Sequence, residues 1–217
     1  LYIDIFSEFY FIFLYIFISA ALLLFNIVYM FGSGIKSRIM AHRIQREIYE
    51  QRQMIENLQE CINRRDQRRL YRKIKNENEL LIYVEALEKN LSEAAEEDVA
   101  AYMIACRNII FDAAEIYRRK PAMEKALFAY FISLIPPKAA ETCRRLGEIL
   151  LSYLEHSTVY CRENVLQALY KLGNADALIR ALQIFQENGW YHEPKLIADG
   201  LIQFRGDKAA LARRMWH

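Results

Sequence analysis

The stretch that decides the fold is YCRENVLQALYKLGNADALIRALQIF, from Tyr160 to Phe185. Its first half places apolar residues such as Val165, Leu169 and Leu172 at the three- and four-residue spacing of one helix face. Gly173 follows as a natural C-terminal cap, because glycine tolerates a positive φ. A second apolar stripe of the same spacing begins directly after the turn. The stretch therefore predicts two short helices joined by a tight turn.

This pair of helices resembles the HEAT repeat, an antiparallel helix pair that stacks into a solenoid. The family pattern at the second helix is roughly V-R-x-x-A-x-x-A-L-x-x-L-G, and the residues on those positions are Cys161, Arg162, Val165, Ala168, Leu169, Leu172 and Gly173. Cys161 and Val165 depart from the pattern in identity but keep its apolar character. The resemblance implies a helical scaffold with an extended surface. Some HEAT-like proteins modify or bind nucleic acid or tetrapyrrole, but the residues for those activities are not found in this sequence.

Weaker copies of the pattern flank the central pair. A shift of 32 residues forward aligns Ile197, Gly200, Leu201 and Phe204 with it, and a shift of 38 residues back aligns Leu127, Tyr130, Phe131 and Leu134. Pro136-Pro137 would end the earlier helix. We expect the partner helices at 97–117, 138–155, 175–188 and 207–217. Residues 76–217 would thus form a HEAT-like α-solenoid of about three helix pairs, with an irregular helical bundle as the alternative. Because 207–217 opens a helix without a following partner, we expect the array to be cut mid-repeat and the protein to continue beyond His217.

Composition favours an all-α chain with no cofactor. Only 7 glycines and 4 prolines occur in 217 residues, and the alternation typical of strands is absent. The four cysteines are Cys61, Cys106, Cys143 and Cys161, without a C-x-x-C pair or a histidine at ligand spacing. We therefore expect reduced, mostly buried thiols and neither a disulfide framework nor a zinc site.

A long apolar run, Phe9–Phe31, lies near the N-terminus and contains 23 residues without a charge. At about 1.5 Å per residue it would cross a hydrocarbon core about 30 Å thick. A secretory leader would have a positive flank and a shorter apolar centre, whereas Asp4 and Glu8 precede this run. A soluble core helix of this length would show polar positions on one side. Residues 1–34 are therefore interpreted as a transmembrane anchor.

The charges that flank the run predict its orientation. Lys36, Arg38, Arg43 and Arg46 follow the run, and no lysine or arginine precedes it. Positive residues remain on the cytoplasmic side of a membrane. We expect a single-pass protein of the cell membrane with its C-terminal domain in the cytoplasm.

Residues 35–75 form a basic segment between the anchor and the repeat domain, with 12 Lys and Arg against 5 Asp and Glu. From Ile35 to Ile62 isoleucine and leucine recur at helical spacing, which predicts a long juxtamembrane helix with one apolar stripe. Two interpretations stay open. The stripe is either the seam of a parallel homodimer through 35–62, or the side of a helix that packs on its own domain.

A cluster of basic residues follows in NRRDQRRLYRKIK, and its members are Arg64, Arg65, Arg68, Arg69, Arg72, Lys73 and Lys75. Such a cluster is most often a solvated face or a surface for an acidic protein partner. It can also attract anionic lipid headgroups, within about 10 Å of the bilayer surface. Nucleic acid is the least favoured ligand, because only Tyr71 supplies an interleaved aromatic ring.

The sequence contains no nucleotide-binding, hydrolase or metalloprotease signature. Glu96-Glu97-Asp98 precedes an apolar helix, where the helix dipole favours acids, so we interpret it as a helix start and not as a metal site. His192-Glu193 lacks a second ligand four residues on. Trp190 and Tyr191 lie in the same predicted turn and are candidate interface anchors, with packing against a neighbouring repeat as the alternative.

These observations favour a membrane-anchored binding protein over an enzyme. The leading hypothesis is a cytoplasmic HEAT-like scaffold that binds a partner protein or serves as the accessory subunit of a membrane complex. The second hypothesis is an anionic-lipid-responsive signalling module that uses residues 64–75. No catalytic residue or metal ligand is assigned.

Overall fold

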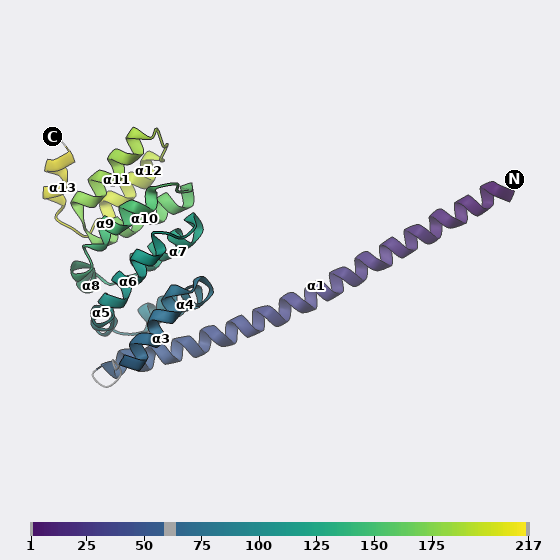
Figure 1. Ribbon diagram of the computed structural model, residues 1–217, viewed down its shortest axis with the longest axis horizontal. Helices are drawn as coiled ribbons and strands as arrows, with labels where there is room; N and C mark the ends of the chain where they lie inside the picture. Colours follow the sequence, from purple (N-terminus) through teal and green to yellow (C-terminus); the bar gives the residue numbers. More distant parts are fainter. Residues whose placement is uncertain (1, 59–63, 216–217) are drawn as a thin grey trace. The chain divides into compact units, whose positions relative to one another are not determined.

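The computed structural model of this protein is all-α, as the sequence predicts (Figure 1). It describes the backbone of residues 2–58 and 64–215, and the side chains of residues 13–30, 34–58 and 65–215. Helices account for 84% of the structure, and the described residues contain no strand. The chain divides into two compact units, Leu1–Arg43 and Ile44–His217.

The first helix, α1 (Tyr2–Glu56), contains the long apolar run. Its large apolar side chains between residues 13 and 30 are exposed; Phe17, for example, is 73% exposed and Leu23 is 65% exposed. Exposed apolar surface costs about 25 cal/mol per Å² in water, so this part of the helix is stable only in apolar surroundings. Among the described residues, α1 is the one helix long and apolar enough to span a membrane, as judged by length and composition.

The second unit contains the end of α1 and the helices that follow it. Their bounds are α3 (Arg64–Lys75), α4 (Glu77–Glu93), α5 (Glu96–Ala105), α6 (Arg107–Tyr117), α7 (Ala122–Ser133), α8 (Pro137–Thr142), α9 (Leu146–Leu151), a 3-10 turn (Ser152–Leu154), α10 (Val159–Leu172), α11 (Ala175–Glu187), α12 (Pro194–Gln203) and α13 (Lys208–Met215). The helix pair predicted from Tyr160–Phe185 corresponds to α10 and α11, so that prediction is confirmed at the level of the two helices.

Local sequence signals explain where the central helices begin and end. The side chain of Thr158 accepts a hydrogen bond from the backbone N–H of Cys161 (3.2 Å), and Asn174 accepts one from Ala177 (3.0 Å). These bonds satisfy N–H groups that have no partner inside the helix. Between α10 and α11, Gly173 has φ +66°, which is the left-handed cap expected from the sequence. Pro137 is the first residue of α8, where its fixed φ and missing N–H suit a helix start.

The helices of the second unit pack in two series (Figure 1). In one series α4 contacts α7, α7 contacts α10 and α10 contacts α12; in the other α3 contacts α6, α6 contacts α9, α9 contacts α11 and α11 contacts α13. A core of apolar residues runs between the two series, and its largest fully buried side chains include Tyr83, Tyr117, Phe128, Phe131 and Tyr153. Aromatic rings dominate its centre, where Tyr117 stacks on Phe128 with centroids 4.6 Å apart.

Two of the helices expected from the sequence are interrupted. The segment 97–117 is divided into α5 and α6 at Cys106, and 138–155 is divided into α8, α9 and the 3-10 turn. In the turn after α8, the carbonyl oxygen of Arg144 accepts a hydrogen bond from the backbone N–H of Gly147 (3.1 Å) and a second one from the side-chain amide of Asn174 (2.9 Å). A residue 30 positions away thus stabilises the interruption.

The basic segment 35–75 is not separate from the following helices. The compact second unit starts at Ile44, and Ile55, Leu70 and Ile74 are buried in its core. The apolar stripe therefore packs on its own domain from Ile44 onward, which is one of the two alternatives that the sequence left open. By contrast, Ile35 and Ile39, in the first unit, are exposed.

Candidate basic interface on helix α3

Helix α3 carries most of the basic cluster, and its two buried apolar residues decide which basic residues face outward. Leu70 and Ile74 lie four residues apart on one side of the helix and are 5% and 0% exposed. Because neighbouring positions on a helix differ by about 100°, the arginines and lysines between and around them point in different directions. The cluster is thus divided between an inner and an outer face.

The inner face pairs with acids on the last turns of α1. The ammonium of Lys73 lies 2.5 Å from Glu47 Oε2 and 3.1 Å from Glu50 Oε2, and Arg69 lies 2.8 Å from Glu50. The side chains of Lys73 and Glu47 are only 14% and 8% exposed. Partial burial opposes ionisation of Glu50, but the hydrogen bond and charge of Lys73, with the bonds from Arg46 and Arg69, hold its pKa below the ordinary value. Lys73 and Arg69 therefore hold α3 against α1.

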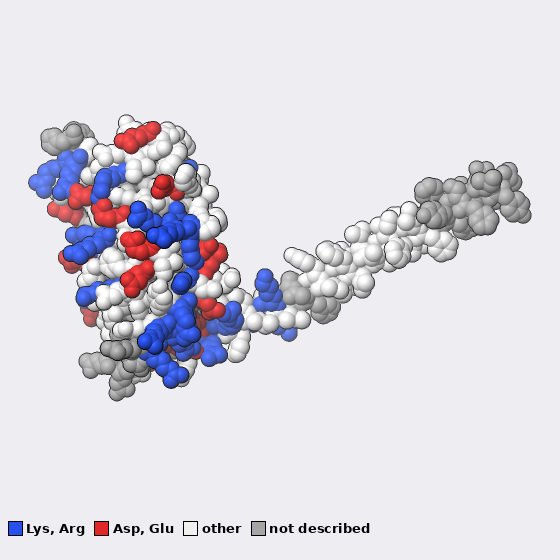
Figure 2. All heavy atoms as spheres, viewed as in Figure 1, with Lys and Arg blue, Asp and Glu red and all other residues white. Residues whose placement is uncertain are grey.

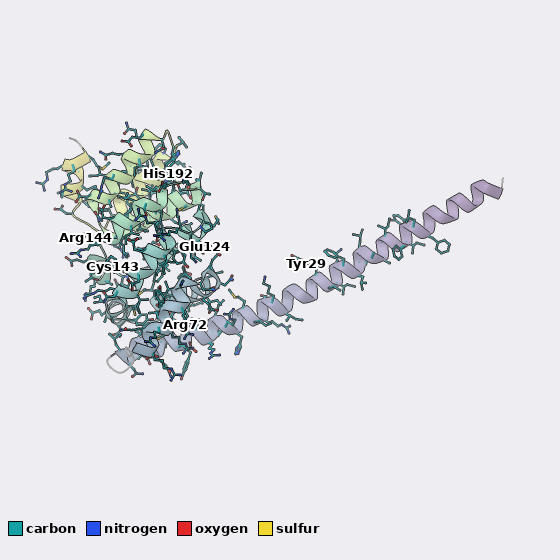
Figure 3. The ribbon with its side chains drawn as sticks, viewed as in Figure 1. Tyr29, Arg72, Glu124, Cys143, Arg144 and His192 are labelled. Atoms are coloured by element: carbon teal, nitrogen blue, oxygen red, sulfur yellow. The ribbon has the colours of Figure 1, made fainter. Side chains whose placement is uncertain are left out.

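The outer face presents Arg68 and Arg72. Both are exposed, and within the part of the chain that the structure describes neither forms an ion pair with a carboxylate. The one hydrogen bond from their side chains runs from Arg72 Nε to the carbonyl oxygen of Arg68 (3.4 Å). Figure 2 shows lysine and arginine side chains gathered over α3, and Figure 3 labels Arg72 on that helix.

An open hollow of about 620 Å³ lies beside these arginines, between α3 and α6. It is lined by Gln67, Arg68, Tyr71, Arg72, Ile109 and Asp112. Two guanidinium groups, an amide and a phenol ring suit a carboxylate or phosphate group, because guanidinium binds such planar or tetrahedral anions through paired hydrogen bonds. Asp112 disfavours a ligand that places negative charge on its side of the hollow.

The remaining residues of the predicted cluster are placed as follows. Arg65 is exposed, and the side chain of Arg64 lies outside the described residues. Lys75 is exposed at the end of α3, where its carbonyl oxygen accepts a hydrogen bond from Lys120 (2.9 Å). Cations at the last turn of a helix also stabilise it through the helix dipole, so Lys75 has a structural role as well.

The two aromatic candidates have different environments. The ring of Trp190 packs against Phe185 (centroids 5.6 Å apart), and the guanidinium carbon of Arg162 lies 4.4 Å from its centroid. Trp190 is therefore half-buried and packs against the α10–α11 pair that directly precedes it, and its use as an interface anchor stays a prediction. Tyr191 is 81% exposed and stays a candidate anchor. The neighbouring His192 packs on Phe185, and partial burial lowers its pKa although Glu163 acts in the opposite direction.

The described residues contain no metal-binding cluster, and their cysteines are buried. No group of three or more His, Cys, Asp or Glu side chains could hold a metal ion there. Glu96, Glu97 and Asp98 form the first turn of α5, as the helix-start interpretation predicts. Cys106, Cys143 and Cys161 are free and buried, and burial raises the pKa of each thiol. Cys61 lies outside the described residues.

Sequence reasoning missed the buried polar residues of α1 that contact α3 and α4. Glu47 and Gln51 are 6% and 0% exposed. Glu47 pairs with Lys73 of α3, and Gln51 donates a hydrogen bond to the carbonyl oxygen of Tyr83 (2.9 Å) and accepts one from Asn90 (3.1 Å), both on α4. Their positions were the available signal, because Glu47 and Gln51 lie eight and four residues before Ile55 and share its side of the helix.

Comparison of this chain with family models, with curated proteins and with solved structures finds no match. The described residues define an all-helical protein in which α1 is long and apolar enough to span a membrane and α3 presents exposed basic residues.

Proposed function

We propose that this protein is a single-pass membrane protein whose cytoplasmic HEAT-like body binds a partner protein and holds it at the membrane. The observation that carries the proposal is that the basic residues of α3 fall into two groups. Lys73, 14% exposed, and Arg69, 50% exposed, pair with acids of α1, whereas Arg68 and Arg72 face solvent beside a hollow. A helix whose position is fixed by its inner charges presents its outer charges in a preorganised arrangement, which favours binding. The ligand is an acidic segment of the partner.

The anchor and its orientation are supported by exposure and charge. The large apolar side chains of residues 13–30 are exposed, and Lys36, Arg38, Arg43 and Arg46 follow them. This arrangement matches a spanning helix with its C-terminal side in the cytoplasm. Only 12 residues separate Phe31 from Ile44, so even a fully extended chain keeps the second unit within about 45 Å of the membrane. A partner bound to it is retained at the membrane surface.

The repeat architecture is supported by the spacing of long-range contacts. Lys171 donates a hydrogen bond to Gln203, and Arg180 to Glu148; both pairs are 32 residues apart, which equals the forward shift of the repeat pattern. Tyrosine hydroxyls bridge similar separations of 43 and 39 residues, from Tyr117 to Ile74 and from Tyr153 to Ala114. Contacts at separations of about one repeat length, here 32 to 43 residues, are what stacked helix pairs produce.

The test compares proximity labelling by the full-length protein in cells with that by two double variants. Arg68→Gln with Arg72→Gln removes the outer charges of α3, whereas Arg144→Gln with Arg145→Gln removes two exposed arginines elsewhere and is the matched control. A partner that is labelled by the wild type and the control, but lost with the α3 variant, supports the proposal. If all three proteins label the same set, the basic interface has no role in binding.

Anionic lipid is a second candidate ligand, because Arg68 and Arg72 are exposed basic residues; it requires the second unit to approach the bilayer to within about 10 Å. Hydrogen exchange of α3 distinguishes a lipid ligand from a protein ligand. It is measured on the full-length protein in nanodiscs of phosphatidylcholine, with and without phosphatidylserine. Protection that requires phosphatidylserine and weakens with salt favours lipid, and unchanged exchange eliminates it. Arg69 is left intact in both tests, because its ion pair with Glu50 fixes the helix.

A further inference from the structure

Helix α7 carries an apolar stripe that its neighbours cover only in part. Met123, Leu127, Tyr130 and Leu134 recur at steps of four, three and four residues, which places them on one side of the helix. Met123 is 57% exposed, and the other three are half-buried at the edge of the core. The opposite side of α7 is fully buried through Phe128, Ala129 and Ile132.

The helices on either side of α7 extend this face. On α4, Leu81 is 44% exposed, and Glu85 and Glu88 follow it at the same helical spacing; on α10, Tyr160 is 52% exposed. The hydroxyl of Tyr130 donates a hydrogen bond to Glu88 Oε1, which joins the outward sides of α7 and α4. This bond, with smaller effects of burial and of the nearby Tyr160, raises the pKa of Tyr130 to about 12, consistent with all three side chains lying on one side.

The charge on this face is mainly acidic. Glu85 and Glu88 border the apolar stripe along α4 and form no ion pair in the described part of the chain, and the exposed Lys89 lies one turn after Glu85. On α10, Tyr160, Asn164 and Gln167 are uncharged, Glu163 beside them is exposed, and Lys171 at the far end donates a hydrogen bond to Gln203. A ligand that complements the face is therefore apolar in its centre and positive beside Glu85 and Glu88.

An amphipathic helix with basic residues on one edge has these properties. The stripe extends over 12 residues, from Met123 to Leu134, and so spans about 17 Å, which corresponds to roughly three turns of an opposing helix. An apolar face of this kind, bordered by polar residues, is typical of helix-in-groove recognition. We propose that the face formed by the α7 stripe, Leu81, Glu85, Glu88 and Tyr160 binds a basic amphipathic helix of a partner protein, with its lysines or arginines beside Glu85 and Glu88.

This inference rests on the proposed role in protein binding, but it uses residues that are separate from the basic interface on α3. The two surfaces have opposite charge, so they select different segments. Loss of binding at one surface leaves the other measurable, and the two proposals fail independently.

The experiment places a photo-crosslinking residue on the face of the full-length protein in cells, as Met123→p-benzoylphenylalanine. The control places the same residue on an exposed position of α11, as Gln183→p-benzoylphenylalanine. Crosslinked peptides are identified by mass spectrometry. We expect an adduct at position 123, absent at 183, whose peptide is a helix with apolar residues on one side and lysine or arginine on its edge.

Charge reversal then tests the proposed orientation. Glu85→Lys with Glu88→Lys should lower the adduct yield about tenfold, because two attractive charge pairs become repulsive. Glu85→Lys alone, which leaves the Tyr130–Glu88 bond intact, should lower it about threefold. Arg68→Gln with Arg72→Gln should leave it unchanged. The proposal is overturned if no adduct forms, or if adducts form only with lipid, with a second copy of this chain, or with acidic or non-helical segments. It is also overturned if the charge-reversal variant keeps its melting temperature and gives the same adduct yield as the wild type.

Discussion

The hydroxyl of Tyr117, on α6, donates a hydrogen bond to the carbonyl oxygen of Ile74, near the end of α3 (2.9 Å). Tyr153 repeats this relationship with Ala114 on α6 (2.7 Å). Each tyrosine is fully buried and reaches back to a helix that comes earlier in the chain. At Ala114 the bond is a second one, because this carbonyl oxygen also accepts the backbone N–H of Arg118 (3.1 Å). Burial is the main reason that the pKa of both tyrosines lies well above the ordinary value, so both hydroxyls remain donors at physiological pH.

Removing either hydroxyl should destabilise the body. Tyr117→Phe removes the side-chain donor to the carbonyl oxygen of Ile74, so we expect it to lower the free energy of unfolding by about 1–2 kcal/mol. Tyr153→Phe should lower it by about 1 kcal/mol, because the carbonyl oxygen of Ala114 keeps the backbone N–H of Arg118 as a donor. Tyr191→Phe, at an 81% exposed position, is the control and should change it by less than about 0.5 kcal/mol. Urea unfolding of the full-length protein in detergent, followed by circular dichroism, measures all three. Equal stabilities would show that these bonds do not hold the helices together.

The Lys73–Glu47 pair should be strongly coupled. Because both side chains are nearly buried, Lys73→Met leaves Glu47 with an uncompensated charge, and we expect a loss of about 3 kcal/mol. Adding Glu47→Leu should restore much of this loss, since the buried charge is then absent. Lys75→Met, at an exposed position, is the matched control. A double-mutant cycle from denaturant unfolding gives the coupling energy, and strictly additive effects would contradict the pairing.

Two glycines with nearly equal φ should differ in their tolerance of alanine. Gly173 has φ +66° and an added Cβ would lie 2.7 Å from the backbone nitrogen of Gly206, whereas Gly189 has φ +63° and open space around it. Gly189→Ala should cost about 1 kcal/mol from backbone strain alone. Gly173→Ala should cost about 3 kcal/mol, because strain and overpacking add. The midpoints of denaturant unfolding separate the two, and a smaller effect at 173 than at 189 would refute the close approach.

The buried thiols should resist modification in the folded protein. Burial raises the pKa of Cys106 to about 12 and that of Cys161 to about 11, from an ordinary value of 9.0. In a Cys61→Ser background, we expect Ellman's reagent at pH 8 to modify the three remaining thiols only after denaturant is added. Because the pKa is higher in the folded state, the thiols contribute stability that is complete below pH 9 and declines as the pH rises toward 11. Rapid labelling of native protein would be inconsistent with this burial.

Much of the helical framework could be predicted because its signals are local. Gly173 ends α10 through its own conformational freedom, and Thr158 and Asn174 lie within three residues of the N–H groups that they cap. The interruption of 138–155 had no such signal. It depends on Asn174, which reaches the carbonyl oxygen of Arg144 from 30 residues away, and a sequence pattern does not reveal that contact.

The basic cluster could be located from the sequence, but its division into two faces could not. Arg68 and Arg69 are identical in type and adjacent, yet one faces solvent and the other pairs with Glu50. That difference follows from which side of α3 is buried, and hence from packing against α1 and α6. The partly covered stripe on α7 was also missed, because Leu127, Tyr130 and Leu134 matched a core pattern and were interpreted as interior residues.

The main contacts of the second unit join helices no more than three apart in chain order. The chain segments between these contacting helices are short compared with the whole body, so they close quickly and at low entropic cost. Each new pair of helices can therefore pack on its neighbours as soon as it has been synthesised. We expect this body to assemble progressively while it emerges from the ribosome, in contrast to folds that must wait for their last strand.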